Sequence, residues 1–239
     1  MKKAAAPQLP RFDRPLVTVD VAIFSVVQGE LRILLARRPD GDDEPFPGRW
    51  ALPGGFVDVH LDASLQACAL RKLKEKTGVS SPYLEQLGSW GDAKRDPRGW
   101  STTHAYFALI PAPAEMEQHA GTAASEWVQA DDARRRRLAF DHGEILAAAI
   151  ERLRGKVEYT SLPAFLCPEP FTLPELQRVY EIVLGRELDK SAFRKRMLDG
   201  AFLEEAGQVN GASGRAAMGY RVRERERATV FPRTFRSVE

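Results

Sequence analysis

The amino-acid sequence predicts a mixed α/β protein with two domains. The first half of the chain alternates segments with the two-residue period of β-strands and segments with the period of helices. This alternation ends in a proline-containing stretch between Gly155 and Pro170, after which two closely spaced helices and a basic strand are expected. A chain of 239 residues is long enough for two domains of ordinary size. We therefore expect domains at residues 1–155 and 156–239.

The N-terminal domain is expected to open with a β-hairpin. β-branched and polar residues alternate in Leu16–Val27, and Leu31–Ala36 is a second apolar strand after a turn at Gly29. A long polar loop then closes on paired glycines, Gly54 and Gly55, which allow a backbone turn that other residues resist.

A helix is expected after the paired glycines. Asp62 or Ser64 can cap its N-terminus, and Gly78 lies where a helix commonly ends. Its apolar stripe consists of Leu65, Ala69 and Leu73. Strands are expected at Thr103–Ile110 and Trp127–Val128. A further helix is expected at Asp141–Leu153, with Asp141 and Glu144 as its capping box.

The composition excludes several classes of protein. Hydrophobic residues make up 44% of the chain and charged residues 28%, as in an average globular protein, so a fibrous or disordered chain is not expected. No apolar stretch is long enough to span a membrane, and Met1-Lys2-Lys3 is not followed by the apolar run of a signal peptide. We expect a cytoplasmic protein without a membrane partner. Cys68 and Cys167 lack the spacing of metal ligands and are expected to be buried thiols.

The charge is balanced over the whole chain and basic near its C-terminus. The 35 Lys and Arg residues and 33 Asp and Glu residues give a formal net charge of +2. Between Leu188 and Arg236, however, there are 11 basic and only 6 acidic residues. Such a local excess indicates contact with a polyanion.

The segment Gly55–Val79 resembles the Nudix box, G-x5-E-x7-R-E-U-x-E-E-x-G-U with U an aliphatic residue. The preceding Leu52–Val57 is also typical of Nudix hydrolases. Two extra residues separate Gly55 from Arg71, and the first glutamate of the motif falls on or near Ala63. The resemblance implies a Nudix-like α/β/α sandwich. The matching positions in the second half of the motif are Arg71, Leu73, Glu75, Gly78 and Val79.

Two other glutamates of the motif are replaced by Lys72 and Lys76. Positions 72, 75 and 76 project from one helical face, where the family's glutamates hold magnesium against a diphosphate. An ammonium group has no lone pair and cannot be a metal ligand near neutral pH. We therefore expect no metal site, no catalytic residue and no cofactor. The lysines either contact the phosphates of a ligand or simply face solvent.

Nearby acidic residues leave one alternative open. Asp58 and Asp62 could in principle rebuild a metal site beside the helix. Arg71 and Glu75 stand one helical turn apart and are expected to form a structural pair.

Residues around the paired glycines are further candidates for ligand binding. Arg37 and Arg38 end a strand and could hold a phosphate or pair with Asp40. Trp50 and Phe56 could stack on an adenine or belong to the core. The complete predicted ligand site is Arg38, Trp50, Phe56, Lys72, Glu75 and Lys76.

Other polar residues receive structural interpretations. His142 is expected to make a local hydrogen bond, and His60 and His104 are given no catalytic role because no Ser or Cys partner occurs at a recognisable motif. Arg134–Arg137 is expected to be a solvated charge run in a polar connection.

The C-terminal domain has the pattern of a helix-turn-helix. Thr172 and Glu175 form a capping box for a first helix, and Asp189 can cap a second helix in which Phe193 and Met197 face inward. The outer side of the second helix is typical of a recognition helix. It carries Lys190, Ser191, Arg194 and Lys195.

A wing is expected beyond the second helix. Gly207–Gly219 is a glycine-rich loop that contains Arg215, and the alternation in Tyr220–Arg227 places four arginines on one side of a strand. These are Arg221, Arg223, Arg225 and Arg227. Arg215 and Arg221 are predicted to contact DNA. A small helical dimerisation module is the alternative for this domain.

Several segments together resemble the NrtR family, the Nudix-related transcriptional regulators of NAD metabolism. They are Ala139–His142, Phe171–Glu181, Leu184–Lys190 and Phe193–Lys195, and the resemblance extends over nearly the whole chain. It implies a Nudix-like domain with a C-terminal winged helix-turn-helix domain. It also implies a homodimeric repressor that binds a double-stranded DNA operator near NAD biosynthesis genes and a nucleotide effector such as ADP-ribose. Ser191-Ala192 departs from the larger polar residues that the family often carries there.

These observations predict a repressor of NAD biosynthesis genes that senses ADP-ribose or a related nucleotide through a catalytically inactive Nudix domain. A magnesium-dependent Nudix pyrophosphatase acting on ADP-ribose-like nucleotides is the main alternative. A sugar-responsive Nudix-related regulator and a protein-binding adaptor are two others.

Overall fold

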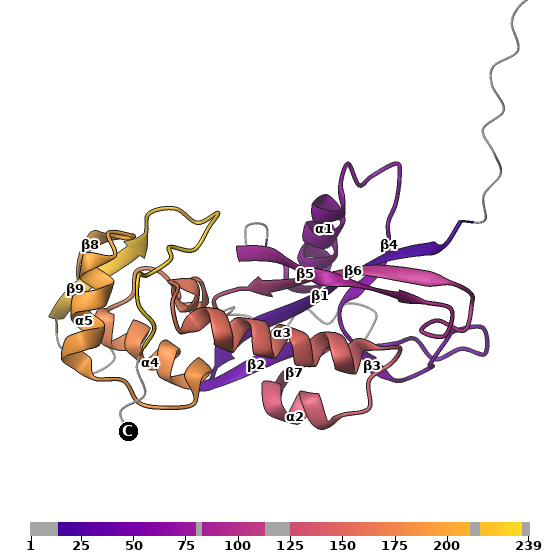
Figure 1. The fold of residues 1–239 in the computed structure, drawn as a ribbon, viewed down its shortest axis with the longest axis horizontal. Coiled ribbons are helices and arrows are strands. Elements are labelled where there is room, and N and C mark those ends of the chain that lie inside the picture. The colour runs from indigo at the N-terminus through magenta and orange to yellow at the C-terminus, as the bar shows by residue number, and fades with distance from the viewer. Residues whose placement is uncertain (1–13, 80–82, 113–124, 211–215, 236–239) are drawn as a thin grey trace, which may run out of the picture.

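The structure, a computed structural model, describes residues 14–79, 83–112, 125–210 and 216–235. These residues form a sheet with helices on both faces, followed by a smaller helical unit that carries a β-hairpin (Figure 1). The mixed α/β architecture expected from the sequence is present.

Strand β1 (Leu16–Val27) lies inside the sheet. It pairs antiparallel with β2 (Glu30–Arg37) and parallel with β6 (Ser101–Leu109). The other strands extend the sheet through these three: β3 (Trp50–Ala51), β4 (Gly54–Phe56), β5 (Tyr83–Asp92) and β7 (Ser125–Gln129).

The two faces of the sheet are covered by different helices. Because successive residues of a strand point to opposite faces, β1 contributes to two hydrophobic clusters. Val19 and Val21 pack on the side of α1 (Leu65–Thr77), whereas Ala22 and Phe24 pack on the side of α3 (His142–Val157). This arrangement is the predicted α/β/α sandwich.

Helix α1 begins and ends where the sequence predicts. The Ser64 hydroxyl accepts a hydrogen bond from the N–H of Ala67, so Ser64 rather than Asp62 is the cap. Gly78 ends the helix with φ = 72°, a conformation that glycine adopts without steric cost.

The C-terminal unit contains the expected pair of helices and a hairpin. Thr172 and Glu175 form the predicted capping box, the Asp189 side chain caps the second helix, and Phe193 and Met197 are buried. The elements of this unit are η1 (Leu162–Leu166), α4 (Leu173–Leu184), α5 (Lys190–Asp199), β8 (Leu203–Asn210) and β9 (Ala216–Val222).

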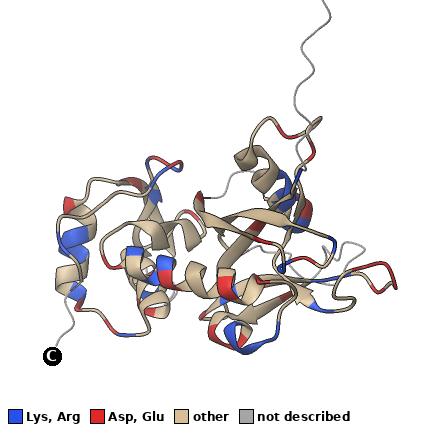
Figure 2. Cartoon of the chain, turned by 45° about the vertical axis from the view of Figure 1, so that its right-hand side comes forward, with Lys and Arg blue, Asp and Glu red and all other residues tan. Residues whose placement is uncertain are grey.

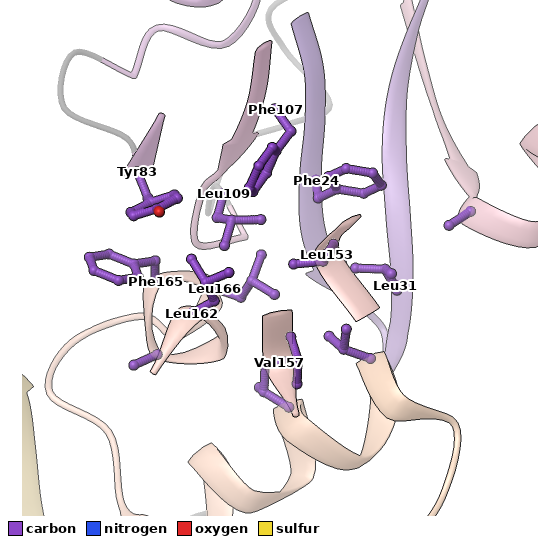
Figure 3. Packing of buried hydrophobic residues seen from close by; sticks show 14 of the residues in the cluster. Phe24, Leu31, Tyr83, Phe107, Leu109, Leu153, Val157, Leu162, Phe165 and Leu166 are labelled. Atoms are coloured by element: carbon purple, nitrogen blue, oxygen red, sulfur yellow. The ribbon is translucent and has the colours of Figure 1, made fainter. Parts of the chain in front are cut away.

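One hydrophobic cluster runs from the sheet through α3 and η1 into the C-terminal helices. Figure 3 shows the middle of this cluster, where Leu153 and Val157 of α3 lie near side chains of the sheet and of η1. Ring contacts add to the packing, because Tyr83 of the sheet lies 4.8 Å from Phe165 of η1 between ring centroids. The two predicted domains therefore share buried apolar surface.

The segment after the hairpin folds back onto the C-terminal helices. The N–H of Phe231 donates to the carbonyl of Tyr159, and the N–H of Phe235 donates to the carbonyl of Glu158. The Phe235 ring is stacked with Phe193 at 6.1 Å and lies beneath the Arg196 guanidinium at 3.9 Å. This aromatic contact ties the returning segment to α5.

Several features of the N-terminal region differ from the sequence-based expectation. Strands β3, β4 and β5 were not expected, and a short helix, α2 (Ala130–Arg135), replaces the predicted polar connection. The capping box predicted at Asp141 and Glu144 is wrong. Asp141 makes no side-chain cap bond, because its carboxylate accepts two hydrogen bonds from Arg95 at 2.8 Å each.

Two minor expectations can also be compared with the structure. Cys68 and Cys167 are buried free thiols, as predicted. Over the described ranges, the helices are all too short or too polar to cross a lipid bilayer.

The buried hydroxyl of Tyr180 provides a test of the contact between α4 and the segment after α3. It donates to the carbonyl of Thr160 at 2.8 Å, and the ring is fully buried. Tyr180→Phe leaves this carbonyl without its partner, so we expect the free energy of unfolding to fall by about 1–2 kcal/mol. Tyr159→Phe is the control, because the Tyr159 side chain is partly exposed. Urea denaturation measures both, and equal stabilities of the two variants would contradict the assignment.

Candidate functional site

A cavity of about 230 Å³ lies between the start of β1, the paired glycines, the segment after β5 and the N-terminus of α3. Three arginines and two phenylalanines line it together with acidic and small residues. The lining residues are Thr18, Asp20, Arg38, Glu44, Ala51, Leu52, Gly54, Gly55, Phe56, Arg95, Asp96, Arg98, Phe140 and His142.

Two guanidinium groups at this cavity are held against aromatic rings. Arg38 lies 4.9 Å above the Phe140 ring and pairs with Glu44 at 2.6 Å. Arg98 lies 4.9 Å above the exposed Phe56 ring. A ring face and a carboxylate fix each guanidinium while leaving N–H groups for a further anion. The pair is suited to a phosphate-bearing ligand.

The partner of Arg98 is the buried carboxylate of Asp96, at 2.8 Å. Burial opposes ionisation of Asp96, but its hydrogen bonds to Arg98 outweigh this and lower the pKa of the carboxyl group. Asp96 therefore remains charged and keeps Arg98 in position at the cavity.

A second set of polar groups forms the buried side of the cavity. Asp20 accepts a hydrogen bond from the Thr103 hydroxyl at 2.7 Å, and His142 Nε2 lies 3.5 Å from the same carboxylate oxygen. Arg95 donates to Asp141 and to the Ser101 hydroxyl. These contacts join β1, β6 and the start of α3.

The tautomer of His142 follows from its partners. Its Nδ1 accepts a hydrogen bond from the backbone N–H of Leu52 at 2.9 Å, so the ring proton lies on Nε2, which faces Asp20. His142 thus has the hydrogen-bonding role that was expected, but its partner lies 90 residues earlier in the chain rather than nearby in the sequence.

The paired glycines are required by close approaches on both sides. A Cβ atom on Gly54 would lie 2.0 Å from Asp20 Oδ1 and 2.6 Å from the carbonyl oxygen of Val19. Gly55 has φ = 150° and faces the end of the Lys72 side chain. Any side chain at position 54 would thus displace the Asp20 carboxylate.

The charged residues of α1 form their own pairs beside the cavity. Arg71 binds Asp62 through two hydrogen bonds of 2.8 and 2.6 Å and also pairs with Glu75 at 3.1 Å, so the predicted Arg71–Glu75 pair is present. The other Glu75 oxygen lies 3.5 Å from Lys72 Nζ. The hydrogen bonds from Arg71 lower the pKa of the Asp62 carboxyl group.

Cys68 lies beside these charges and is not activated by them. Burial and the neighbouring Asp62 carboxylate raise the pKa of its thiol to about 11, so the thiol stays protonated near neutral pH.

The structure separates the six predicted ligand residues into two groups. Arg38 and Phe56 line the cavity. Trp50 does not line it, because its side chain packs against the main hydrophobic cluster. Lys72, Glu75 and Lys76 are also outside the lining, although Lys72 reaches Gly55, which is part of it.

Several lining residues were missed by the sequence-based reasoning. Asp20 is one of the polar residues of the expected strand Leu16–Val27 and has no predicted role, and Arg95, Asp96 and Arg98 lie where no helix or strand is predicted. The signal that was present is Asp20 itself, because a charged residue inside an otherwise apolar strand requires buried partners.

The predicted DNA-binding residues of α5 are exposed. In Figure 2 basic residues colour much of this helix blue, and the helix lies away from the sheet. Lys190, Ser191 and Arg194 belong to its exposed side, and Lys195 pairs with Asp199 at 2.7 Å. Among the described residues, no ion pair involves Lys190 or Arg194. Their contact with DNA stays a prediction.

The predicted row of arginines on the wing is wrong. Strand β9 ends at Val222, so the two-residue period places only Arg221 in the hairpin, where it is exposed. Arg223 donates to the carbonyl of Leu203 at 2.9 Å, Arg225 pairs with Glu169, and Arg227 pairs with Glu224. Arg215 and much of the predicted glycine-rich loop lie outside the described residues, which resume at β9.

Comparison with family models assigns both halves of the chain. Residues 16–149 match the NUDIX domain, and residues 163–222 match the NrtR DNA-binding winged helix domain. A Nudix domain joined to a DNA-binding winged helix defines the class of protein.

Individual relatives agree with this class along the length of the chain. The ADPR responsive transcriptional repressor NtrR of Acinetobacter baylyi is 51% identical over 222 residues, which are 93% of this chain and 88% of that protein. The crystal structure of Shewanella oneidensis NrtR matches with a TM-score of 0.83 and 39% identity, covering 92% of this chain and 99% of that chain. The chain therefore belongs to the NrtR family.

Two further structures of the Shewanella oneidensis protein bear on the functional sites. The same Shewanella oneidensis protein has been crystallised with a 27mer DNA, again with a TM-score of 0.83, 39% identity and coverage of 92% and 99%. Its NUDIX domain with ADP ribose is 41% identical, with a TM-score of 0.52, over 59% of this chain and 90% of that one.

The close approach at Gly54 gives a test of the cavity. Gly54→Ala places a methyl group against Asp20, so we expect the free energy of unfolding to fall by about 1–3 kcal/mol and nucleotide affinity to be lost. Gly155→Ala is the matched control, because a Cβ at this helical position meets no atom within 4 Å. It is expected to raise stability by about 0.5–1 kcal/mol. Thermal unfolding measures the stability and calorimetry measures the nucleotide affinity. A Gly54→Ala protein with unchanged stability and affinity would contradict the close approach of Gly54 to Asp20.

Proposed function

We propose that this protein is a transcriptional repressor of NAD biosynthesis genes that acts as a homodimer and responds to ADP-ribose or a related nucleotide. The observation that carries the proposal is the similarity to the Acinetobacter baylyi ADPR responsive repressor, which extends over 93% of this chain. The cytoplasmic location expected from the sequence is part of the same proposal.

The effector site is the cavity at the start of α3. Arg38 and Arg98 supply guanidinium groups for a diphosphate, and the exposed Phe56 ring offers a face for an adenine. Lys72 lies close enough to Gly55 to add a positive charge at the edge of the site. Trp50, Glu75 and Lys76 then have structural or surface roles.

The domain is proposed to bind its nucleotide without hydrolysing it. Magnesium needs carboxylate oxygens with free lone pairs, but Asp62 is held by Arg71 and by the N–H of Asp58, and Glu75 is shared between Arg71 and Lys72. The residues of this helix therefore do not fit the ion, and the alternative site at Asp58 and Asp62 has no support.

One observation supports the alternative function, a pyrophosphatase. The ADP-ribose pyrophosphatase of Methanocaldococcus jannaschii is 33% identical over 126 residues, which are 53% of this chain and 70% of that enzyme. This relative matches only part of the chain, whereas the repressor matches both the Nudix domain and the winged helix.

We propose that residues 1–155 form the effector domain and residues 156–239 form the DNA-binding domain. Helix α3 crosses this boundary and ends at Val157. Its first residue, His142, lines the cavity, and Glu158 directly after it pairs with Arg186 beyond α4 at 3.0 Å. A ligand that moves α3 would thus move the winged helix.

Such coupling requires a ligand that prefers one arrangement of the domains over the other. In a dimer, two recognition helices must reach successive major grooves about one helical turn apart. A small displacement of α3 in each subunit would change that separation, and ADP-ribose would then release the operator.

Gel retardation with promoter DNA from the genes beside this one tests the proposal. We expect retardation at low salt and its loss when ADP-ribose is added, because the relative is a responsive repressor. The same incubation with magnesium is expected to release no AMP. DNA of equal length from an unrelated gene is the control. Robust AMP release would establish the pyrophosphatase alternative, and failure to retard any neighbouring promoter would favour an adaptor.

The role of α5 is tested by removing its exposed cations. Replacing Lys190 and Arg194 by alanine removes two phosphate contacts, so we expect weaker binding to every DNA sequence. The slope of log affinity against log salt concentration should fall by about 2. Arg135→Ala on α2 removes one exposed charge distant from α5 and should change neither quantity. An unchanged salt slope in the double variant would exclude α5 from the interface.

A further inference from the structure

The buried side of the cavity contains a carboxylate with one oxygen that the protein does not use. The Asp20 side chain is only 7% exposed, and it lines the cavity. Its Oδ2 atom accepts a hydrogen bond from Thr103 and faces His142 and Arg95. Within the described ranges, Oδ1 has no hydrogen-bond donor. Oδ1 is not one of the fully buried atoms that lack a partner, so it is accessible from the cavity and free to accept a hydrogen bond from a ligand or from water.

The charge of Asp20 is retained rather than neutralised. Arg95 Nη2 approaches only to 3.9 Å, because its strong hydrogen bonds go to Asp141. Burial opposes ionisation, but His142, the Thr103 hydroxyl and Arg95 outweigh it, so the pKa of Asp20 lies below its usual range. The free oxygen is therefore an ionised acceptor.

Two of the three lining arginines lie at the more exposed side of the cavity, whereas the third, Arg95, is held by Asp141. Arg38 and Arg98 are more exposed, with side chains 18% and 36% accessible, whereas Asp20 is among the most buried lining residues. A ligand must therefore present its negative charge to the arginines and hydrogen-bond donors to Asp20. A second phosphate at Asp20 would meet like charge in a poorly hydrated place.

The size of the cavity restricts which part of a nucleotide can reach Asp20. A volume of about 230 Å³ is below the range usual for complete ligands, so only part of an ADP-ribose molecule fits inside. A ribose unit carries hydroxyl donors and no charge, which matches the buried side. The adenine would then remain near the exposed Phe56 ring.

We infer that Asp20 Oδ1 accepts hydrogen bonds from the hydroxyl groups of the distal sugar of a nucleoside diphosphate sugar, which enters the cavity sugar-first. Asp20 then determines specificity, because it favours a free sugar and excludes a phosphorylated one. Gly54 is required for this role, since a side chain there would displace the same oxygen. The inference rests on the proposed effector site.

Calorimetry with three probes tests the inference on the full-length protein: ADP-ribose, ADP, and ADP-ribose phosphorylated on its distal ribose. The wild-type protein is expected to bind ADP-ribose at least about tenfold more tightly than either other probe, since one charge-assisted hydrogen bond supplies such a factor. Asp20→Asn should weaken ADP-ribose binding about tenfold, leave ADP binding unchanged and reduce the discrimination against the phosphorylated sugar.

Thr103→Val is the matched control, because it removes the donor to Oδ2 and keeps the carboxylate. It should retain the preference for ADP-ribose over ADP. DNA binding by each variant shows that it is folded. If Asp20→Asn does not fold, the three affinities of the wild-type protein decide the question alone.

The possible failures are distinguishable. Equal wild-type affinities for ADP-ribose and ADP would overturn the inference and leave the effector site intact. An equal loss of both affinities in Asp20→Asn would also overturn it, because Asp20 would then act on the common part of the ligand or on the fold. A wild-type protein that binds none of the probes would instead overturn the proposed function.

Discussion

The burial of α3 along its whole length is the constraint on which the rest of the structure depends. Its apolar residues pack against the sheet and against η1 and α4. Removing this apolar surface from water is the main favourable contribution to its position. Because the helix is held at both ends, the polar groups at its start and the winged helix at its end have a fixed relationship.

The fixed position of α3 also determines the partners of the polar groups at its start. Asp141 and His142 cannot turn to solvent, so they take partners from distant strands and loops, Arg95 and the backbone of Leu52. Buried charged groups are tolerated only when paired and hydrogen-bonded. The charged groups of the cavity are therefore held largely in pairs, and Asp20 Oδ1 is a carboxylate oxygen without a hydrogen bond from the described residues.

The sequence predicted the parts of the fold that local patterns encode. The caps at Ser64, Thr172 and Asp189 were recognised because a cap and its partner lie within three residues. Strand β5 was missed because its glycines and a register shift between Gln86 and Gly88 interrupt the alternation of side chains.

The site was harder to predict because its contacts are long-range. The bond between Arg95 and Asp141 joins residues 46 positions apart, and nothing in either local sequence indicates the other. The Nudix motif indicated Lys72 and Lys76 on α1 as ligand-binding residues. The cavity is instead lined by the paired glycines together with residues of β1, of the segment after β5 and of the start of α3. Arg38 and Phe56 were found because they flank this turn. On the wing, the prediction assumed that the strand continues to Arg227, but β9 ends at Val222, so the two-residue alternation does not apply to the later arginines.

The segment that returns to α5 after the hairpin shows that a unit of sequence similarity need not be a unit of folding. The winged helix match ends at residue 222, but two aromatic residues beyond it take part in the packing. Phe235 contacts Tyr180 and Phe193, and Phe231 contacts Phe202. A fragment that ends at residue 222 would lack both rings and would leave Arg196 without its stacking surface. The folded C-terminal unit of this chain therefore extends to Phe235, beyond the residues that the family model matches.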